Sequence, residues 1–380
     1  MGAMRVVICP DKFASTLTAV EVARAVAEGW AEVAPDDTVL IRPLSDGGPG
    51  FVEVLGAALP DARSVAVPTT DPLGRPVTGH VLIAASPGGP VAYVESAEAC
   101  GLHLLAEDER DPKRTTTFGL GPLLIAAVES GARTVVVGLG GSATNDCGAG
   151  LLAALGATPL DASGLFIGYG GAAVTNCATL SGAPRLRDVA LVAATDVDNP
   201  LTGLHGASAI YGPQKGATRE DVFLLDAALA RFAQVLQNNL ETCPPQVADR
   251  PGAGAAGGLG AALLALGGRV ESGIGLVHRL IGLDDVLDAA DLVITGEGSF
   301  DEQSLRGKVA AGVAGAARDR GVPCVVLAGR ISAGRREAAA AGVTEAHSLV
   351  EHFGSVEAAM TRPAEGLRAL GGRLAGQWSR

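Results

Sequence analysis

Short apolar runs alternate with amphipathic segments along most of the chain. In the first amphipathic segment, Val22, Val26, Trp30 and Val33 recur every three or four residues, which predicts a helix with one buried face. Thr18 with Glu21 forms a capping box at its start. The apolar runs predict buried strands at 5–9, 38–44, 134–139, 190–196, 291–298 and 323–329. Alternating strands and helices are typical of α/β proteins with parallel sheets.

The pattern changes between residues 62 and 95, where short strands are separated by Pro and Gly turns. This stretch predicts a local antiparallel meander. The βαβ pattern then returns and continues to the C-terminal part of the chain. We therefore expect two α/β domains: a Rossmann-like parallel-sheet domain formed by residues 1–62 plus 285–380, and an inserted mixed α/β domain of residues 63–284. We expect the active site in the cleft between them.

Composition agrees with this picture and narrows the function. The chain has 380 residues, of which 48% are hydrophobic, so it can form two cores. Gly is frequent, with 53 residues, and aromatic residues make up only 3%, as is typical of closely packed α/β folds. The formal net charge of -12 argues against nucleic acid as a partner. An anionic substrate must therefore meet local cations.

The cysteines and the apolar segments indicate the cellular location. Six cysteines are scattered without a C-x-x-C pair, which predicts reduced thiols in a cytoplasmic protein. Asp11 and Lys12 interrupt the first apolar run, so we expect no secretory signal. Residues 251–268 are uncharged, but their first half is mostly Gly and Ala, so we expect a loop and a buried helix, and no membrane partner. No pattern indicates the oligomeric state.

The stretch GGSATNDCGAG at residues 140–150 combines many glycines with polar side chains directly after a predicted strand. Glycine lets backbone N–H groups approach a ligand, and successive N–H groups form a concavity that suits anions. We therefore expect a phosphate site here. The alternative is a tight turn whose glycines serve only close packing. The candidate phosphate-binding residues are Gly140, Gly141, Ser142, Thr144 and Asn145.

Carboxylates recur at the ends of the predicted strands: Asp11, Asp46, Asp196, Glu297 and Asp301. In open α/β sheets ligands bind at the carboxyl edge. A single Asp there is commonly a helix cap, but five together favour a bound cation or a catalytic base. The pattern predicts Mg²⁺ and a phosphate substrate.

Two nucleotide motifs were tested against the sequence. No G-x-x-x-x-G-K-[ST] occurs, which excludes the P-loop fold. Two G-x-G-x-x-[GA] matches, at residues 138–143 and 252–257, lack the strand or the acidic residue that dinucleotide binding requires. An NAD-dependent oxidoreductase of a small hydroxy acid is therefore an inferior alternative.

Long and unusual strings carry a family resemblance. They are PDKF, DGG, TTTFGLG, GGSATND, DVDNPLTG, GPQKGAT, PGAGAAGGLG and ITGEGSFDEQSLRGK. With them the chain resembles the bacterial glycerate kinase family. The resemblance implies ATP- and Mg²⁺-dependent phosphorylation of D-glycerate to 2- or 3-phosphoglycerate, on a two-domain fold unrelated to the P-loop kinases. A non-catalytic, ligand-binding descendant stays as an alternative.

The chain also departs from the pattern of this family. Members usually have Lys-Gly where this chain has Ala14 and Ser15, and an acidic residue and Thr where it has Pro49 and Phe51. They also have Gly where it has Cys147. These positions lie in the loops assigned to the site, so the departures concern substrate contacts and rate.

Roles follow from the demands of phosphoryl transfer, which needs a base, cations and aligned oxygens. Asp196 is the candidate base, although DVDNP also suits an Asx turn. Glu297 and Asp301 are the candidate Mg²⁺ ligands. Lys215 and Lys308 are flanked by Gly and could approach the transferred phosphate, the alternative being solvated surface lysines. The remaining candidates are Asp11, Lys12, Asp46, Asn199 and Arg330 for the substrate, and Gly254 and Gly257 for the nucleotide.

Overall fold

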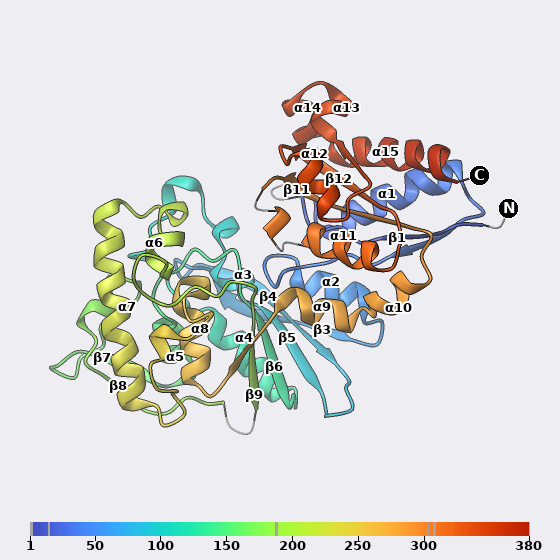
Figure 1. Ribbon diagram of the computed structural model, residues 1–380. Helices are drawn as coiled ribbons and strands as arrows, with labels where there is room; N and C mark the ends of the chain where they lie inside the picture. Colours follow the sequence, from blue (N-terminus) through green and yellow to red (C-terminus); the bar gives the residue numbers. More distant parts are fainter. Residues whose placement is uncertain (1–2, 14–15, 187–188, 303, 307–308, 380) are drawn as a thin grey trace. The chain divides into compact units, whose positions relative to one another are not determined.

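The structure is a computed structural model of the chain (Figure 1). It describes residues 3–13, 16–186, 189–302, 304–306 and 309–379. The chain forms two compact units, and each is built from separate stretches of the sequence. We call them unit 1 and unit 2. Unit 1 comprises Met1–Asp46, Glu53–Leu59 and Ile274–Arg380, and unit 2 comprises Gly47–Val52 and Pro60–Gly273.

The sheet of unit 1 is parallel throughout, which confirms the predicted Rossmann-like arrangement. Its strand order is β13-β12-β11-β1-β2. The strands are β1 (Arg5–Ile8), β2 (Thr38–Ile41), β11 (Leu292–Phe300), β12 (Cys324–Ile331) and β13 (Glu345–Ser348). From β1 the chain continues to β2 on one side of the sheet, and from β11 it continues to β12 and β13 on the other side. The strand order therefore reverses between β1 and β11. Such a reversal places a crevice at the carboxyl edge of the sheet.

Helix α1 (Ala19–Val33) follows β1 and begins with the predicted capping box of Thr18 and Glu21. It buries Val22, Val26 and Trp30 as expected, whereas Val33, the last residue of the helix, is 53% exposed. The other helices with residues in unit 1 are α2 (Phe51–Ala58), α9 (Gly273–Leu280), α10 (Leu283–Asp288), α11 (Val309–Asp319), α12 (Arg335–Ala340), α13 (Leu349–Phe353), α14 (Val356–Thr361) and α15 (Pro363–Trp378).

The main sheet of unit 2 is mixed, with the order β10-β9-β6-β5-β4-β3. Strands β10, β9, β6 and β5 run parallel, and β5, β4 and β3 form the predicted antiparallel meander. The strands are β3 (Arg63–Thr70), β4 (Pro76–Ala84), β5 (Val91–Glu95), β6 (Thr134–Gly138), β9 (Ala190–Ala194) and β10 (Arg269–Glu271), with a separate pair β7 (Thr158–Leu160) and β8 (Thr179–Ser181).

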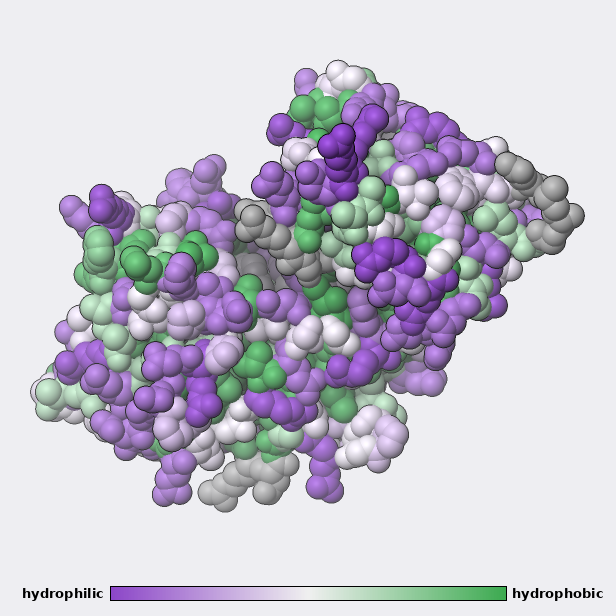
Figure 2. Space-filling view, in the orientation of Figure 1, coloured by the Kyte–Doolittle hydropathy of each residue, from purple (hydrophilic) through white to green (hydrophobic). Residues whose placement is uncertain are grey.

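The helices of unit 2 contribute to two hydrophobic cores. Helix α4 (Leu120–Glu129) packs on the main sheet, while the long α7 (Arg219–Asn239) packs with α5 (Ala149–Leu155) and α8 (Ala255–Ala265). Short helices α3 (Ala97–Cys100) and α6 (Ala207–Tyr211) complete the unit. Figure 2 shows hydrophobic residues at the surface over α6 and α7, where Ile210 is 46% and Phe223 is 67% exposed. No helix in the described ranges combines the length and the apolar character that a bilayer crossing requires.

The closest helix pair of unit 1 is α1 with α15, and glycine makes it possible. A Cβ added at Gly29 would lie 1.9 Å from the carbonyl oxygen of Arg368, and one at Gly371 would lie 2.4 Å from the carbonyl oxygen of Val26. The two backbones therefore touch without intervening side chains.

We predict that Gly29→Ala lowers the free energy of unfolding by about 1–3 kcal/mol, because the helices must separate to admit the methyl group. Gly312→Ala is the matched control, since a Cβ at this exposed position in α11 meets no atom within 4 Å. The control is expected to gain about 1 kcal/mol from helix propensity. Urea unfolding of both variants and the parent measures the difference, and equal loss in both variants would contradict the close packing.

Candidate functional site

A cavity of about 450 Å³ lies in unit 1, and five predicted site residues line it. They are Asp11, Lys12, Asp46, Glu297 and Arg330. These side chains come from four strand ends that are far apart in the sequence, and the parallel sheet brings them together. The predicted convergence of charged groups at the carboxyl edge is therefore observed in this unit.

The strands that carry these residues differ in length from the prediction. Asp11 follows β1, and its N–H donates to the carbonyl of Gly296 at 2.8 Å, which fixes it beside β11. Arg330 was expected just beyond its strand but lies within β12, and β11 extends past Glu297 to Phe300, two residues beyond the predicted end. The reason is that pairing between the two strands continues through Ser299 opposite Arg330.

The charges that line the cavity do not balance. Lys12 Nζ lies 3.9 Å from Asp11 Oδ1 and 3.6 Å from Asp46 Oδ1. Among the described residues that line the cavity, three carboxylates against two cations leave one net negative charge. An additional cation would favour the binding of an anionic ligand there.

Asp301 stands apart from this group. Asp301 is not among the residues that line the cavity, and its Oδ1 accepts hydrogen bonds from Ser304 N at 3.1 Å and Ser304 Oγ at 3.4 Å. Its carboxylate thus closes a local turn. Lys308 lies outside the described residues, as do Ala14 and Ser15.

The described residues contain no group of three or more His, Cys, Asp or Glu side chains arranged to hold a metal ion. Mg²⁺ commonly uses only one or two carboxylates and keeps several waters or substrate oxygens. The oxygen donors and the net negative charge of the unit 1 cavity therefore fit Mg²⁺.

The cavity also has an apolar end that the sequence did not indicate. Leu349 begins α13, and Val356 and Met360 belong to α14. These helices follow the last strand of the sheet, and no local motif marks their side chains as lining a cavity.

In unit 2, the loop of residues 140–146 follows β6 as expected. The backbone N–H groups of Gly141, Ser142 and Thr144 donate no hydrogen bond to another described residue. Thr144 Oγ1 and Asn145 Oδ1 are also buried without a partner in the described structure. Buried polar groups of this kind are uncommon in proteins. The loop therefore has several groups that are suited to a polar ligand or an ordered water.

Lys215 lies under this loop and is only 2% exposed. Its ammonium group donates to Ser142 Oγ at 2.9 Å and to the carbonyl of Thr144 at 2.7 Å. Burial lowers the pKa of Lys215 to about 7, although the nearby carboxylate of Asp146 opposes the shift. Lys215 is therefore not a solvated surface lysine. It is a buried side chain that holds the loop through two hydrogen bonds.

Asp146 is the buried carboxylate of the same loop. It accepts hydrogen bonds from Thr117 N, Thr117 Oγ1, Gly148 N and Gly150 N at 2.9 to 3.2 Å. Burial raises its pKa, and these hydrogen bonds counteract the rise. Asp146 and its partner Thr117 were missed as functional candidates, although both lie in the strings GGSATND and TTTFGLG.

The glycines of both Gly-rich segments are used for close packing. A Cβ at Gly140 would lie 2.6 Å from Gly48 Cα, and one at Gly141 would lie 2.7 Å from the Pro49 ring. In the second segment, a Cβ added at Gly254 would lie 2.3 Å from the carbonyl oxygen of Pro200. One added at Gly257, which has φ 69°, would lie 1.9 Å from the carbonyl oxygen of Thr144. The packing alternative for these glycines is thus supported at each position.

The departures from the family pattern have structural consequences. Phe51 is fully buried and packs edge-on against Tyr93, with ring centroids 6.3 Å apart. Cys147 is buried at φ 51°, a left-handed conformation that disfavours residues other than Gly. A residue with a side chain is therefore strained at position 147.

The two candidates after β9 have different surroundings. Asp196 is exposed, and Ser272 Oγ donates to its Oδ1 at 2.6 Å. Asn199 uses its side chain within the protein, since Nδ2 donates to the carbonyl of His205 at 2.8 Å and Oδ1 accepts from the hydroxyl of Tyr211 at 2.6 Å. Asn199 therefore fixes the loop, while Asp196 presents its carboxylate to solvent. Ser272 was not anticipated from the sequence.

We predict that Lys215 gives the protein a pH-dependent stability. With a folded-state pKa near 7 against an ordinary value of about 10.4, the unfolded state binds more protons between these two pH values. The free energy of unfolding should therefore rise with pH across this window, by roughly 1 kcal/mol per pH unit at most. Lys215→Met removes this contribution, so urea unfolding of parent and variant at pH 7, 8 and 9 should show a growing difference in favour of the parent. A difference independent of pH would mean that Lys215 stays charged.

Comparison with known proteins gives a consistent result. The model of the family described as "Glycerate kinase family" matches residues 6–379 of the chain. A glycerate 2-kinase of Escherichia coli K12 is 44% identical over 87% of this chain and 86% of its own length, and a glycerate kinase of Bacillus subtilis 168 is 42% identical over 95% and 94%. A crystal structure described as a candidate glycerate kinase 2 from Salmonella typhimurium LT2 superposes with a TM-score of 0.79, at 39% identity over 99% of this chain and 98% of that one. The chain belongs to the glycerate kinase family.

Proposed function

We propose that the protein transfers the γ-phosphate of ATP to the 2-hydroxyl of D-glycerate, giving 2-phosphoglycerate and ADP. Kinase activity with ATP as the phosphate donor accompanies family membership. The choice of the 2-hydroxyl rests on the E. coli relative, which is named a glycerate 2-kinase. The observation that carries the proposal is the unit 1 cavity, where carboxylates and cations meet at the carboxyl edge of a parallel sheet.

The cations of this cavity are proposed to hold the carboxylate of glycerate. Arg330 is exposed and offers a planar guanidinium, which can bind a carboxylate through two parallel hydrogen bonds. Lys12 lies between Asp11 and Asp46, so these two carboxylates orient its ammonium group. The role of Asp11 and Asp46 is thus to position the cation.

Mg²⁺ is proposed to bind Glu297. This carboxylate is 7% exposed, and the described residues that line its cavity carry one net negative charge. When bound, Mg²⁺ neutralises phosphate charge and polarises the phosphoryl group. Asp301 is retained only as a group that shapes the turn after Glu297, because Ser304 engages its carboxylate.

The loop of residues 140–146 is proposed to bind phosphate through its backbone N–H groups. The unbonded N–H groups of Gly141, Ser142 and Thr144 support this role. Lys215 contributes by fixing Ser142 and Thr144 from below, and its positive charge adds to the local field. Gly254 and Gly257 act through packing, because they let the second Gly-rich segment approach this loop.

Asp196 is the proposed general base that takes the proton of the attacking hydroxyl. Its exposure makes the carboxylate accessible, and the hydrogen bond from Ser272 Oγ orients its Oδ1. Removal of a positioned base typically lowers the rate by a factor of about 10²–10⁴.

The cysteines support a cytoplasmic location as part of this proposal. All six are free thiols in the structure, five of them buried. Reduced thiols are the usual state in the cytoplasm.

The experiment that tests the function incubates the purified protein with D-glycerate, ATP and Mg²⁺, and identifies the product by ³¹P NMR. We expect ADP and 2-phosphoglycerate in equal amounts. Asp196→Asn should lower kcat by about 10²–10⁴ without unfolding, and Asp198→Asn, at an exposed neighbouring carboxylate, is the matched control. Formation of 3-phosphoglycerate would reject the regiochemistry, and no product would reject the function.

Metal dependence gives a separate prediction. Glu297→Gln should raise the Mg²⁺ concentration for half-maximal rate at least about tenfold, because a neutral amide is a weaker ligand than a carboxylate. Glu302→Gln removes the same charge from an exposed position that does not line the cavity, and should behave like the parent. Magnesium titration of the initial rate decides between them. An unchanged requirement in Glu297→Gln would remove this residue from the metal site.

A further inference from the structure

Unit 2 contains a second cavity that none of the roles above uses. Its volume is about 310 Å³, and it lies between the turn after β3 and the segment that precedes α4. The residues that line it include Thr70, Leu73, Arg114, Thr116, Phe118 and Tyr169.

This cavity concentrates aromatic side chains in a protein that has few of them. Aromatic residues make up 3% of the chain, yet two rings line this cavity and a third, Phe166, packs against one of them. Tyr169 packs edge-on against Phe118 with ring centroids 5.2 Å apart, and against Phe166 at 5.1 Å. Tyr169 is 48% and Phe166 is 44% exposed. The rings of Tyr169 and Phe118 thus provide an apolar wall for a planar ligand.

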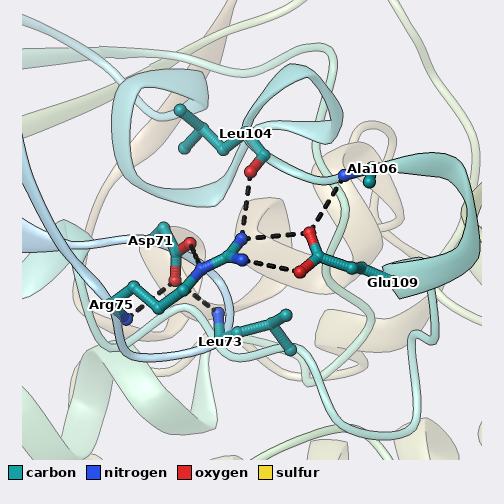
Figure 3. A network of polar contacts seen from close by, with 6 residues as sticks. All are labelled: Asp71, Leu73, Arg75, Leu104, Ala106 and Glu109. Carbon is teal, nitrogen blue, oxygen red and sulfur yellow. Dashed lines mark hydrogen bonds and ion pairs between the residues drawn. The ribbon is translucent and has the colours of Figure 1, made fainter.

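The opposite wall is held rigid by a polar network (Figure 3). Asp71 is 2% exposed and accepts hydrogen bonds from Leu73 N at 2.8 Å, Arg75 N at 2.9 Å and Arg75 Nε at 2.5 Å. The same guanidinium donates to the carboxylate of Glu109 at 2.6 and 3.2 Å and to the carbonyl of Leu104 at 3.1 Å. This network closes the turn that carries Leu73 and ties it to residues 104–109. The cavity is therefore preformed on that side.

The cavity is built directly onto the loop of residues 140–146. Thr115 Oγ1 donates to the carbonyl of Ala143 at 2.8 Å, one residue before Thr116. In the second ring-bearing segment, a Cβ at Gly171, two residues after Tyr169, would lie 2.6 Å from the carbonyl oxygen of Asn145. The segments that carry Phe118 and Tyr169 thus both contact the loop that is proposed to bind phosphate.

We propose that this cavity binds the adenine base of ATP, with the base against the rings of Tyr169 and Phe118. The inference deepens the proposed kinase function and rests on it. Aromatic rings are the usual stacking partners of nucleobases. Arg114 is exposed at the cavity and forms no salt bridge within the described ranges, so its guanidinium is available to the base or to a phosphate. A nucleotide seated in this way has its phosphates beside the loop of residues 140–146.

The competing location is the apolar end of the unit 1 cavity, at Leu349, Val356 and Met360. Phe13 is the one ring among the described residues that line it, and it is only 2% exposed. This end offers little aromatic surface for stacking. We therefore assign the base to the cavity in unit 2.

The test measures the affinity for ADP and for inorganic tripolyphosphate by calorimetric titration, together with KM for ATP and for D-glycerate. Tyr169→Ala should weaken ADP binding and raise KM for ATP roughly five- to 150-fold, the range of base stacking. Tripolyphosphate affinity and KM for D-glycerate should not change, because neither ligand has a base. Tyr169→Phe keeps the ring and should restore parental values.

Two further variants serve as controls, and thermal unfolding verifies that each variant is folded. Phe223→Ala removes an exposed ring of α7 outside the cavity and should bind ADP like the parent. Met360→Ala tests the competing location. Parental ADP affinity in Tyr169→Ala, equal weakening of ADP and tripolyphosphate, or weakening only in Met360→Ala would each overturn the assignment. Failure of the parent to phosphorylate D-glycerate, with ADP binding that still depends on Tyr169, would reject the proposed function alone.

Discussion

The candidate site in unit 2 depends on a backbone contact between two Gly-rich segments. The N–H of Cys147 donates to the carbonyl of Gly257 at 3.1 Å, and Gly257 approaches the carbonyl of Thr144 so closely that no Cβ fits. This contact buries a loop that is rich in polar groups. Burial in turn demands partners for those groups, since an unsatisfied buried polar group is costly. Lys215 and the hydrogen bonds to Asp146 meet most of this demand.

The same constraint explains why the loop is suited to a ligand. Its side chains and carbonyls are held from below by Lys215 and from the side by Thr115 and Thr117. The N–H groups that the protein does not use are fixed in position before any ligand binds. A donor that is already oriented needs no reorganisation when charge arrives, and such preorganisation is a major source of catalytic stabilisation. Glycine thus serves packing on one side of the loop and access on the other.

In unit 1, the main constraint is the charge of the residues that line the cavity. The described residues that line its cavity include three carboxylates and two cations, and Lys12 lies within 4 Å of two of the carboxylates. The net negative charge of these described residues repels a carboxylate or a phosphate. A divalent cation reverses the sign of the charge in the cavity, so binding of metal and of anionic substrate is expected to be coupled. The acidic overall charge of the chain is compatible with anionic substrates only through such local arrangements.

Much of the fold was determined by the sequence itself. The apolar runs located β1, β2, β6, β9, β11 and β12, because buried strands leave a local pattern. The pair Thr18 and Glu21 located the start of α1, because a capping box is also a local pattern. The carboxylates at strand ends were found for the same reason, since parallel strands bring their carboxyl ends to one edge. Only the tertiary structure decided that β12 extends through Arg330, that Ser304 donates to the carboxylate of Asp301, and that Lys215 is buried. It also revealed the clustering of Tyr169 with Phe118 and the packing role of Gly254 and Gly257. These features depend on contacts between residues that are distant along the chain, and such contacts leave no periodic signal in the sequence.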